Sequence, residues 1–401
     1  METFDLLIQN ARLRSGDRCD IGIGAGRIRL IDERLQHPAQ KTIDAGGMLV
    51  TESFCNPHLH LDKVFTLARL DDAAMAAYHG EGMGKAMAAI ESAARVKEDY
   101  QAEWALKNIR VALEMAVRAG NTHIRAFADV DNKARLEGVR ALLQAKAEFA
   151  GRLALQVVAF PQDGVVREPG AAALVREAMD LGADLVGGIP WIEYTDRDAQ
   201  IHVDEMFAVA RDFDAGVSML VDDAGDPGLR TTEMMAVRAI ELGWEGRVLG
   251  HHARAMALYP KPYFQRLAAL LKQARMGIVT DPHTGPLHAR VRELLEEGCL
   301  VALGQDDITD AYYPFGRNNM LEVAFLAAHT LWMTTRPDME TLYDMVTLDA
   351  ARAMGIEGHR LAVGGPANLV VLDAPDVLEA LRFHREPKTV VFEGKIISGG
   401  D

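Results

Sequence analysis

Two histidines two positions apart end an apolar run in the stretch FCNPHLHLDK, residues 54–63. Residues i and i+2 of a strand point to the same side, so His58 and His60 can face one site. Much later in the chain, GQDD supplies the adjacent carboxylates Asp306 and Asp307. Imidazole and carboxylate groups bind zinc or ferrous iron, and such an ion lowers the pKa of a coordinated water to near neutrality. These residue types therefore favour metal-assisted hydrolysis.

Eight apolar runs have to position these residues. The runs alternate with amphipathic stretches of helical period across residues 51–355, which is the pattern of a closed (β/α)8 barrel of roughly 250 residues. They cover residues 48–60, 123–130, 153–160, 184–189, 216–223, 247–252, 277–282 and 300–307. Active sites of such barrels lie at the carboxyl ends of the strands. Further polar candidates fall at these ends, namely Asp129, Gln162, Glu193, Asp222, Asp223, His251, His252, Asp281 and His283.

The two ends of the chain have a different pattern. Residues 1–50 and 356–401 contain short strand-like runs separated by Gly, Asn or Asp. We therefore predict an α/β fold in which a (β/α)8 TIM barrel over residues 51–355 carries a small β-sandwich formed by the N- and C-terminal segments. The methionine-rich segment 75–90 is typical of a packing helix, with a lid over the barrel mouth as the alternative.

Composition excludes several classes of function. The chain has 43 Lys and Arg against 58 Asp and Glu, a net charge of −15, and no basic patch, so neither nucleic acid nor a membrane is expected as a partner. The first residues lack the basic region of a signal peptide, and no apolar run is long enough to span a bilayer. Three cysteines without CxxC spacing fit a reducing compartment. A cytoplasmic location is the expectation.

Several motifs together resemble the amidohydrolase superfamily, in its cytosine deaminase and N-isopropylammelide amidohydrolase branch. They are PHLHLDK, Gln162 in VVAFPQDG, GGIPWIEYT, GHHARAM and GQDDITDAYYPFGRNNM. The resemblance implies a distorted barrel, one divalent metal ion, zinc or iron(II), and a homo-oligomer. It also implies a small heterocyclic substrate that loses an amine by hydrolysis, with release of ammonia.

The resemblance also implies a role for each matching residue. His58, His60 and Asp306 are expected to bind the metal, and Asp306 to take the proton of the attacking water. His252 is expected to stabilise the hydroxide, and Asp223 to protonate the ring nitrogen. The substrate would contact Gln162, which reads the edge of the ring, and also Lys63, Trp191 and Asp307.

One departure from the family pattern concerns the metal. Leu220 stands where the family has a metal-binding histidine on strand five, and Asp223 stands in place of a glutamate. Three outcomes follow: Asp222 or Asp223 replaces the lost ligand, His252 moves onto the metal, or the site is weak or empty. Two other functions stay open, a hydrolase that releases an alkylamine or opens a cyclic amide, and a metal-free, non-catalytic binding protein.

Overall fold

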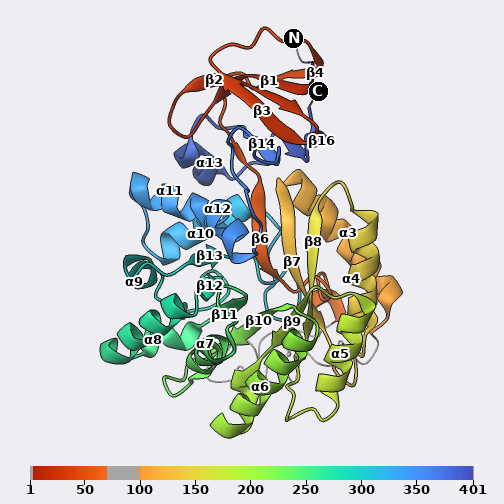
Figure 1. Ribbon diagram of the computed structural model, residues 1–401, viewed down its shortest axis with the longest axis vertical. Coiled ribbons are helices and arrows are strands. Elements are labelled where there is room, and N and C mark those ends of the chain that lie inside the picture. Colours follow the sequence, from red (N-terminus) through yellow and green to blue (C-terminus); the bar gives the residue numbers. More distant parts are fainter. Residues whose placement is uncertain (1–2, 70–96, 98–99, 401) are drawn as a thin grey trace.

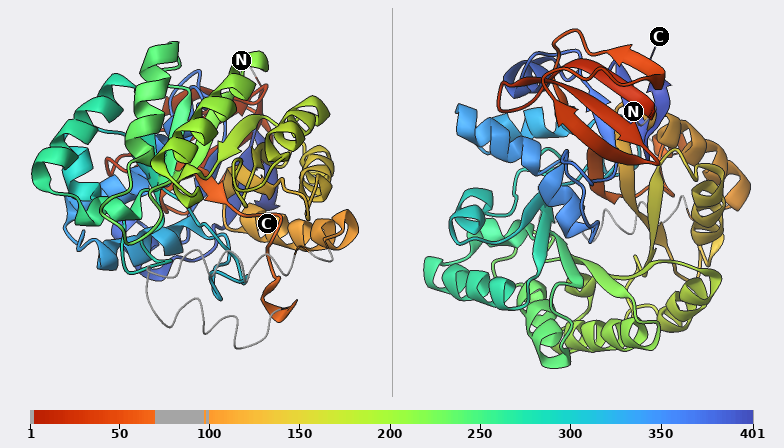
Figure 2. Two further views of the ribbon diagram at one scale, coloured as in Figure 1. Left: turned by 90° about the horizontal axis from the view of Figure 1, so that it is seen from below. Right: turned by 45° about the horizontal axis from the view of Figure 1, so that its top comes forward.

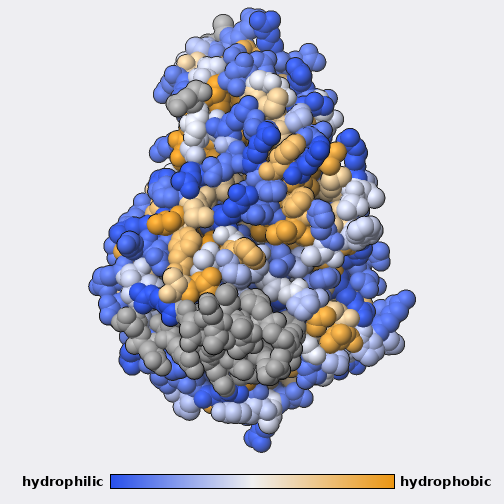
Figure 3. Space-filling model, turned by 180° about the vertical axis from the view of Figure 1, so that it is seen from behind, coloured by the Kyte–Doolittle hydropathy of each residue, from blue (hydrophilic) through white to orange (hydrophobic). Residues whose placement is uncertain are grey.

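The computed structural model describes residues 3–69, 97 and 100–400. The methionine-rich segment 75–90, predicted as a helix or lid, lies outside these residues. Among the described residues, no helix is both long and apolar enough to cross a membrane. Figure 3 shows a face that is mostly hydrophilic, with apolar side chains in scattered patches, as the composition predicts.

An eight-stranded parallel sheet forms the barrel, and each strand lies beside the strand before it in the chain. The strands are β6 (Phe54–Leu59), β7 (Asn121–Asp129), β8 (Ala154–Phe160), β9 (Leu185–Gly188), β10 (Gly216–Val221), β11 (Val248–His252), β12 (Gly277–Thr280) and β13 (Val301–Leu303). Seven of the eight predicted runs contain one of these strands, and the run 123–130 overlaps β7, which begins two residues earlier, so the predicted barrel is confirmed. One set of their apolar side chains lies in a core with those of the surrounding helices, and the others form two smaller clusters.

The barrel closes only at the carboxyl ends of its first and last strands. There the Asp306 backbone N–H donates to the His58 carbonyl over 3.0 Å, and the His60 N–H donates to the Asp306 carbonyl over 2.8 Å. Below this point, Cys55 of β6 and Leu303 of β13 donate instead to the carbonyls of residues 346 and 345. The chain therefore passes between β6 and β13 on the side of the amino ends of the strands, the floor of the barrel, and this insertion explains the distortion of the barrel.

Helices form an outer ring around the strands, as Figure 2 shows. They are α3 (Ala102–Arg118), α4 (Glu137–Glu148), α5 (Ala171–Leu181), α6 (Asp196–Asp212), α7 (Thr231–Leu242), α8 (Lys261–Gln273), α9 (Val291–Glu296), α10 (Met320–Thr330) and α11 (Arg336–Asp344). In α3, the buried residues Leu106, Ile109, Leu113 and Val117 recur at spacings of three and four and so form the stripe that faces the strands.

The short helix α12 (Leu348–Ala353) closes the floor of the barrel. Its Ala350 and Ala351 pack with Cys55, Leu249 and Val279, which come from three different strands. Because side chains fill this end, we expect ligands to reach the interior from the carboxyl ends of the strands.

Both ends of the chain build the β-sandwich, which lies at one end of the barrel (Figure 1). One sheet has the order β3-β2-β1-β4 and the other the order β16-β15-β14-β5. The strands are β1 (Phe4–Arg12), β2 (Arg18–Gly24), β3 (Arg27–Asp32), β4 (Ala39–Asp44), β5 (Val50–Glu52), β14 (Leu369–Val371), β15 (Thr389–Phe392) and β16 (Lys395–Gly399), with α13 (Val377–Phe383) between β14 and β15. Ile8 and Ile21 of the first sheet pack against Leu369 and Val391 of the second. The predicted joint sandwich is confirmed.

Candidate active site

Four buried side chains meet at the carboxyl ends of the barrel strands. One donor atom from each of His58, His60, His252 and Asp306 lies within 4.8 Å of the others. Asp306 Oδ1 is 3.0 Å from Nε2 of His58, 3.8 Å from Nε2 of His60 and 3.9 Å from Nε2 of His252. Ligands about 2.1 Å from a tetrahedral zinc ion are about 3.4 Å apart. The residues present therefore fit a divalent metal ion.

The backbone turns two of these residues into the barrel mouth. His252 and Asp306 have φ angles of 67° and 69°, in the left-handed region that residues with a Cβ rarely adopt. Such a conformation costs on the order of 1–3 kcal/mol and concentrates at functional sites. Gly304 is needed nearby, because a Cβ there would lie 2.7 Å from the Cβ of His58.

The carboxylates around His252 favour a positive charge on its imidazole or beside it. Its Nδ1 lies 2.8 Å from Asp281 Oδ1, a hydrogen bond that leaves Nε2 directed at the cluster. This Nε2 is buried and has no hydrogen-bond partner among the residues the structure describes. Burial alone would lower the pKa of His252, but Asp223, Asp281 and Asp306 outweigh it and raise the pKa to about 9. Either a proton or a metal ion satisfies these carboxylates, and a carboxylate that orients a histidine in this way is common behind metal ligands.

The loop after β10 separates the two adjacent aspartates. Asp222 accepts the backbone N–H groups of Thr231 and Thr232 at the start of α7, over 2.6 and 3.1 Å, and the Tyr259 hydroxyl over 2.7 Å. This carboxylate is therefore occupied by the fold and is not part of the cluster. Asp223 points the other way, and its Oδ2 is 3.9 Å from Nε2 of His252.

Leu220, at the position of the absent histidine, lies in an apolar cluster with Phe127, Phe160 and Trp191. The indole Nε1 of Trp191 is buried and has no hydrogen-bond partner in the described part of the chain. These side chains form an apolar surface beside the barrel mouth. Of the three possibilities for the lost ligand, the geometry favours His252.

Arg254 was missed by the sequence reasoning. Its guanidinium donates to Asp281 over 2.7 Å and to Thr284 over 2.8 Å, and lies 2.6 Å from Asp223. It thus joins the ends of β10 and β12 behind His252. The arginine in GHHARAM, two positions after a candidate histidine, was a signal that could have identified it.

His251 also faces the barrel interior, where its Nε2 is 2.6 Å from the Ser218 hydroxyl. Its ring centroid is 4.5 Å from that of His58, so it packs against a member of the cluster. Although the two histidines are adjacent, both face inward, because the backbone at His252 is left-handed, and only His252 belongs to the cluster of possible metal ligands.

A second polar group lies on the β6–β8 side of the mouth. The buried Lys63 ammonium donates to Asp129 over 2.7 Å and to Gln162 Oε1 over 3.1 Å. Lys97 binds the other oxygen of Asp129 at 2.9 Å. Burial would raise the pKa of Asp129, but the two lysines outweigh it and lower the pKa. Because Lys63 occupies the amide oxygen of Gln162, the amide nitrogen is left to donate elsewhere.

Asp307 is buried beside Asp306, and burial together with Asp306 and Asp310 raises its pKa well above the usual range.

Glu193 is not part of the site. Its carboxylate accepts backbone N–H groups at residues 165–167 and pairs with His202 over 2.8 Å. That glutamate holds a loop in place.

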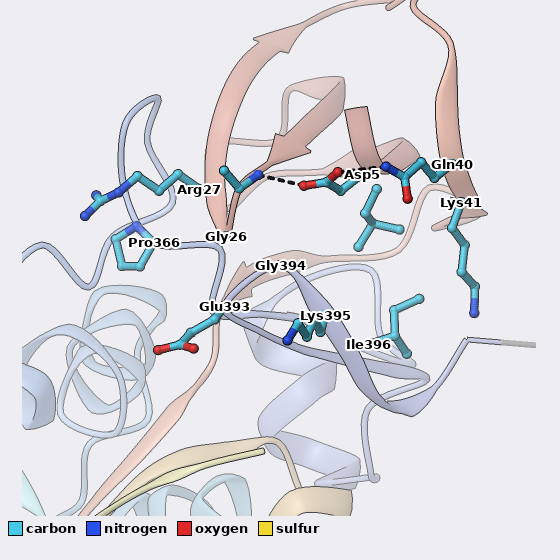
Figure 4. Close-up of a pocket in the computed structure, with 12 residues that line it drawn as sticks. Asp5, Gly26, Arg27, Gln40, Lys41, Pro366, Glu393, Gly394, Lys395 and Ile396 are labelled. Carbon is cyan, nitrogen blue, oxygen red and sulfur yellow. Dashed lines mark hydrogen bonds between the residues drawn. The ribbon is translucent and has the colours of Figure 1, made fainter. Parts of the chain in front are cut away.

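The structure has another pocket, of about 830 Å³, in the β-sandwich. Figure 4 shows Asp5 there, accepting hydrogen bonds from Gln40 and from a backbone N–H. None of its lining residues belongs to the predicted site. The chemistry-bearing side chains are therefore gathered at the barrel mouth and not here.

The chain is similar to known proteins over nearly its whole length. The amidohydrolase family model matches residues 41–398. The chain is 31% identical over 398 residues to an N-isopropylammelide isopropyl amidohydrolase of Pseudomonas sp. (strain ADP), covering 98% of this chain and 97% of that protein. It is 26% identical to a pterin deaminase of Rhizobium rhizogenes, covering 95% of this chain and 88% of that protein.

Solved structures show the same architecture. A 5-methylcytosine deaminase from Klebsiella pneumoniae, liganded with 5-fluorocytosine, superposes with a TM-score of 0.88 at 30% identity, covering 98% of both chains. An N-isopropylammelide isopropylaminohydrolase from Burkholderia multivorans superposes with a TM-score of 0.88 at 27% identity, also covering 98% of both. With its fold and sequence matched over nearly its whole length, the chain belongs to the amidohydrolase family and is a hydrolase of carbon–nitrogen bonds.

Proposed function

We propose that the protein is a metal-dependent hydrolytic deaminase that removes ammonia from a small nitrogen heterocycle, a cytosine-like pyrimidine or an aminotriazine. The observation that carries the proposal is the buried cluster of His58, His60, His252 and Asp306 at the barrel mouth. The names of the relatives, deaminases and amidohydrolases of pyrimidines, pterins and triazines, support this substrate class.

In this proposal the four clustered residues hold one zinc or iron(II) ion, and His252 replaces the strand-five histidine that Leu220 removes. When bound, the ion would acidify a water molecule and make it a nucleophile near neutral pH. The Nδ1–H of a neutral His252 is committed to Asp281, so its Nε2 can only accept. His252 then acts as a ligand and not as the hydrogen-bond donor that the family resemblance implies.

Two aspartates would move the protons. Burial and Asp281 raise the pKa of Asp306, which suits a group that first accepts the proton of the attacking water and later delivers it to the departing amine. Burial raises the pKa of Asp223 as well, although His252 and Arg254 oppose it. A carboxyl group whose pKa is raised holds its proton to a higher pH than an ordinary aspartate does, which suits it to protonating a ring nitrogen.

The remaining mouth residues would bind the ring. The amide nitrogen of Gln162 would donate to a ring oxygen or nitrogen, because its oxygen is held by Lys63. Trp191 and its apolar neighbours would lie against the planar ring, and Lys63 and Asp307 would contact its polar substituents. A site that pairs with one edge of a heterocycle strongly rejects analogues that lack that edge.

A second candidate is a hydrolase that releases an alkylamine, which the N-isopropylammelide relative favours. Its product distinguishes it, since an N-alkylated ring would yield an alkylamine in place of ammonia. The non-catalytic alternative is set aside by the family match. A homo-oligomer and the absence of nucleic-acid partners stay predictions.

The test combines metal content with product release. Purified protein is assayed by elemental mass spectrometry, and ammonia and alkylamine release is screened over aminopyrimidines, aminopterins and aminotriazines. The metal content is expected to fall by one equivalent of zinc or iron in His58→Ala and to stay unchanged in the exposed control His329→Ala, with ammonia as product. Protein that stays metal-free after both ions are supplied would overturn the proposal.

A further inference from the structure

A second cluster of metal-binding side chains lies at the opposite end of the barrel. Cys55 of β6, His123 of β7 and His359, in the segment that leads from α12 to the sandwich, are all buried. One donor atom from each lies within 4.8 Å of the others. Cys55 and His123 are paired in register on adjacent parallel strands, so their side chains point to the same side of the sheet.

We propose that these three residues bind a second metal ion, a structural zinc, at the floor of the barrel. A tetrahedral zinc ion with Zn–S near 2.3 Å and Zn–N near 2.05 Å separates sulfur from nitrogen by about 3.6 Å. Cys55 Sγ and His359 Nε2 are 3.7 Å apart. The pair already has the separation that a shared ion requires.

The surroundings orient both imidazoles. His123 Nδ1 is 2.8 Å from the Thr122 hydroxyl, which is itself 2.6 Å from the Ser53 hydroxyl. With the proton on Nδ1, the Nε2 lone pair of His123 is free for the ion. His359 Nε2 lies 2.9 Å from the Ser53 carbonyl oxygen, a hydrogen bond in which the imidazole donates, so its proton would move to Nδ1 when Nε2 binds the ion.

Binding would take place with loss of the thiol proton. The Cys55 thiol is fully buried, so zinc would bind the thiolate and release one proton to solvent. One thiolate leaves the zinc centre with a single net positive charge. The buried Glu52 carboxylate lies near enough to influence His359 electrostatically and would offset that charge.

An ion bound at this site would cross-link two parts of the chain. β6 and β7 belong to the barrel, whereas His359 precedes the last strands of the sandwich. An ion that binds all three positions would hold the returning chain against the floor. It would therefore raise thermal stability without taking part in the chemistry at the mouth.

Cobalt(II) distinguishes the two sites, because none of the four clustered residues at the mouth is a cysteine. Metal-depleted full-length protein is titrated anaerobically with cobalt(II), and the thiolate-to-cobalt charge-transfer band is recorded. The wild type is expected to show the band, and Cys55→Ser to lose it. The matched control Cys299→Ser, at another buried cysteine, should retain it. Absence of the band in the wild type, or its persistence in Cys55→Ser, would overturn the proposal.

A second variant keeps the test valid if Cys55→Ser folds poorly. His359→Gln retains the thiol and should weaken cobalt binding at the floor about tenfold or more, seen as a shift in the titration midpoint of the band. Zinc removal by a chelator should lower the melting temperature of His58→Ala, which lacks a ligand at the mouth, but not that of the double variant His58→Ala/Cys55→Ser, which lacks a ligand at both sites. Unchanged cobalt affinity in His359→Gln would contradict the proposed ligand set.

Discussion

His252 at the mouth of the barrel and His123 at its floor have opposite pKa shifts. At the mouth, three carboxylates outweigh burial and raise the pKa of His252 to about 9. At the floor, burial and, to a smaller degree, the neighbouring His359 lower the pKa of His123 to about 3. The carboxylates therefore call for a cation at His252, whether proton or metal, whereas burial keeps His123 neutral, as it does His58 and His60. The same residue type serves both ends because its surroundings, and not its sequence motif, set its charge.

The largest effect is expected at the carboxylate shared by all three mouth histidines. Asp306→Asn removes a proposed ligand and the proposed proton carrier together, so kcat/KM should fall at least about 10³-fold. Steady-state assays of ammonia release measure kcat/KM. Asp180→Asn, on the exposed surface of α5, is the matched control and should be unchanged. Activity within tenfold of the wild type would show that the chemistry does not depend on this group.

The adjacent aspartates after β10 give a paired test at the mouth. Asp223→Asn should lower kcat by about 10²-fold with little change in stability, because its proposed task is proton donation. Asp222→Asn should instead lower the free energy of unfolding by about 2 kcal/mol, because its carboxylate accepts the first N–H groups of α7 and the Tyr259 hydroxyl. Chemical denaturation and kinetics on both variants measure the contrast. Equal losses of stability would remove the distinction between them.

The replacement of the strand-five ligand can be examined directly. His252→Asn should weaken metal binding at the mouth by at least about tenfold, measured by competition with a chromophoric chelator. Adding Leu220→His to that variant should recover part of the affinity, since it restores an imidazole at the end of β10. His329→Asn serves as the exposed control. Metal affinity that is the same in His252→Asn and the wild type would mean that His252 is not a ligand.

Much of the fold and part of the site could be predicted from sequence. Alternating apolar and helical runs identified all eight strands, and the i, i+2 spacing placed His58 and His60 on one side of β6. The place of His252 at the site was expected from the family resemblance alone, because the left-handed backbone that turns it inward is not visible in the local pattern. The partners of Arg254 lie about 30 residues away on either side in the chain, so only the folded barrel brings them together. The local sequence pattern predicts the strands and helices, whereas the ion pairs across the barrel mouth depend on the tertiary structure.

The smallest expected effect is on the pH dependence of stability, and it concerns His123 at the floor in protein kept metal-free by a chelator. The pKa of His123 is about 3 when folded, against about 6.5 when unfolded. Below pH 6.5 the unfolded chain binds a proton that the folded chain does not, so stability falls as the pH drops toward 3. Between pH 6.5 and 5 this one histidine should account for about 1.5 kcal/mol. His123→Asn should therefore lose less stability over that range than the wild type or His329→Asn, measured by denaturation at each pH. An identical pH dependence would mean that the floor, like the mouth, offers its histidine a charge partner.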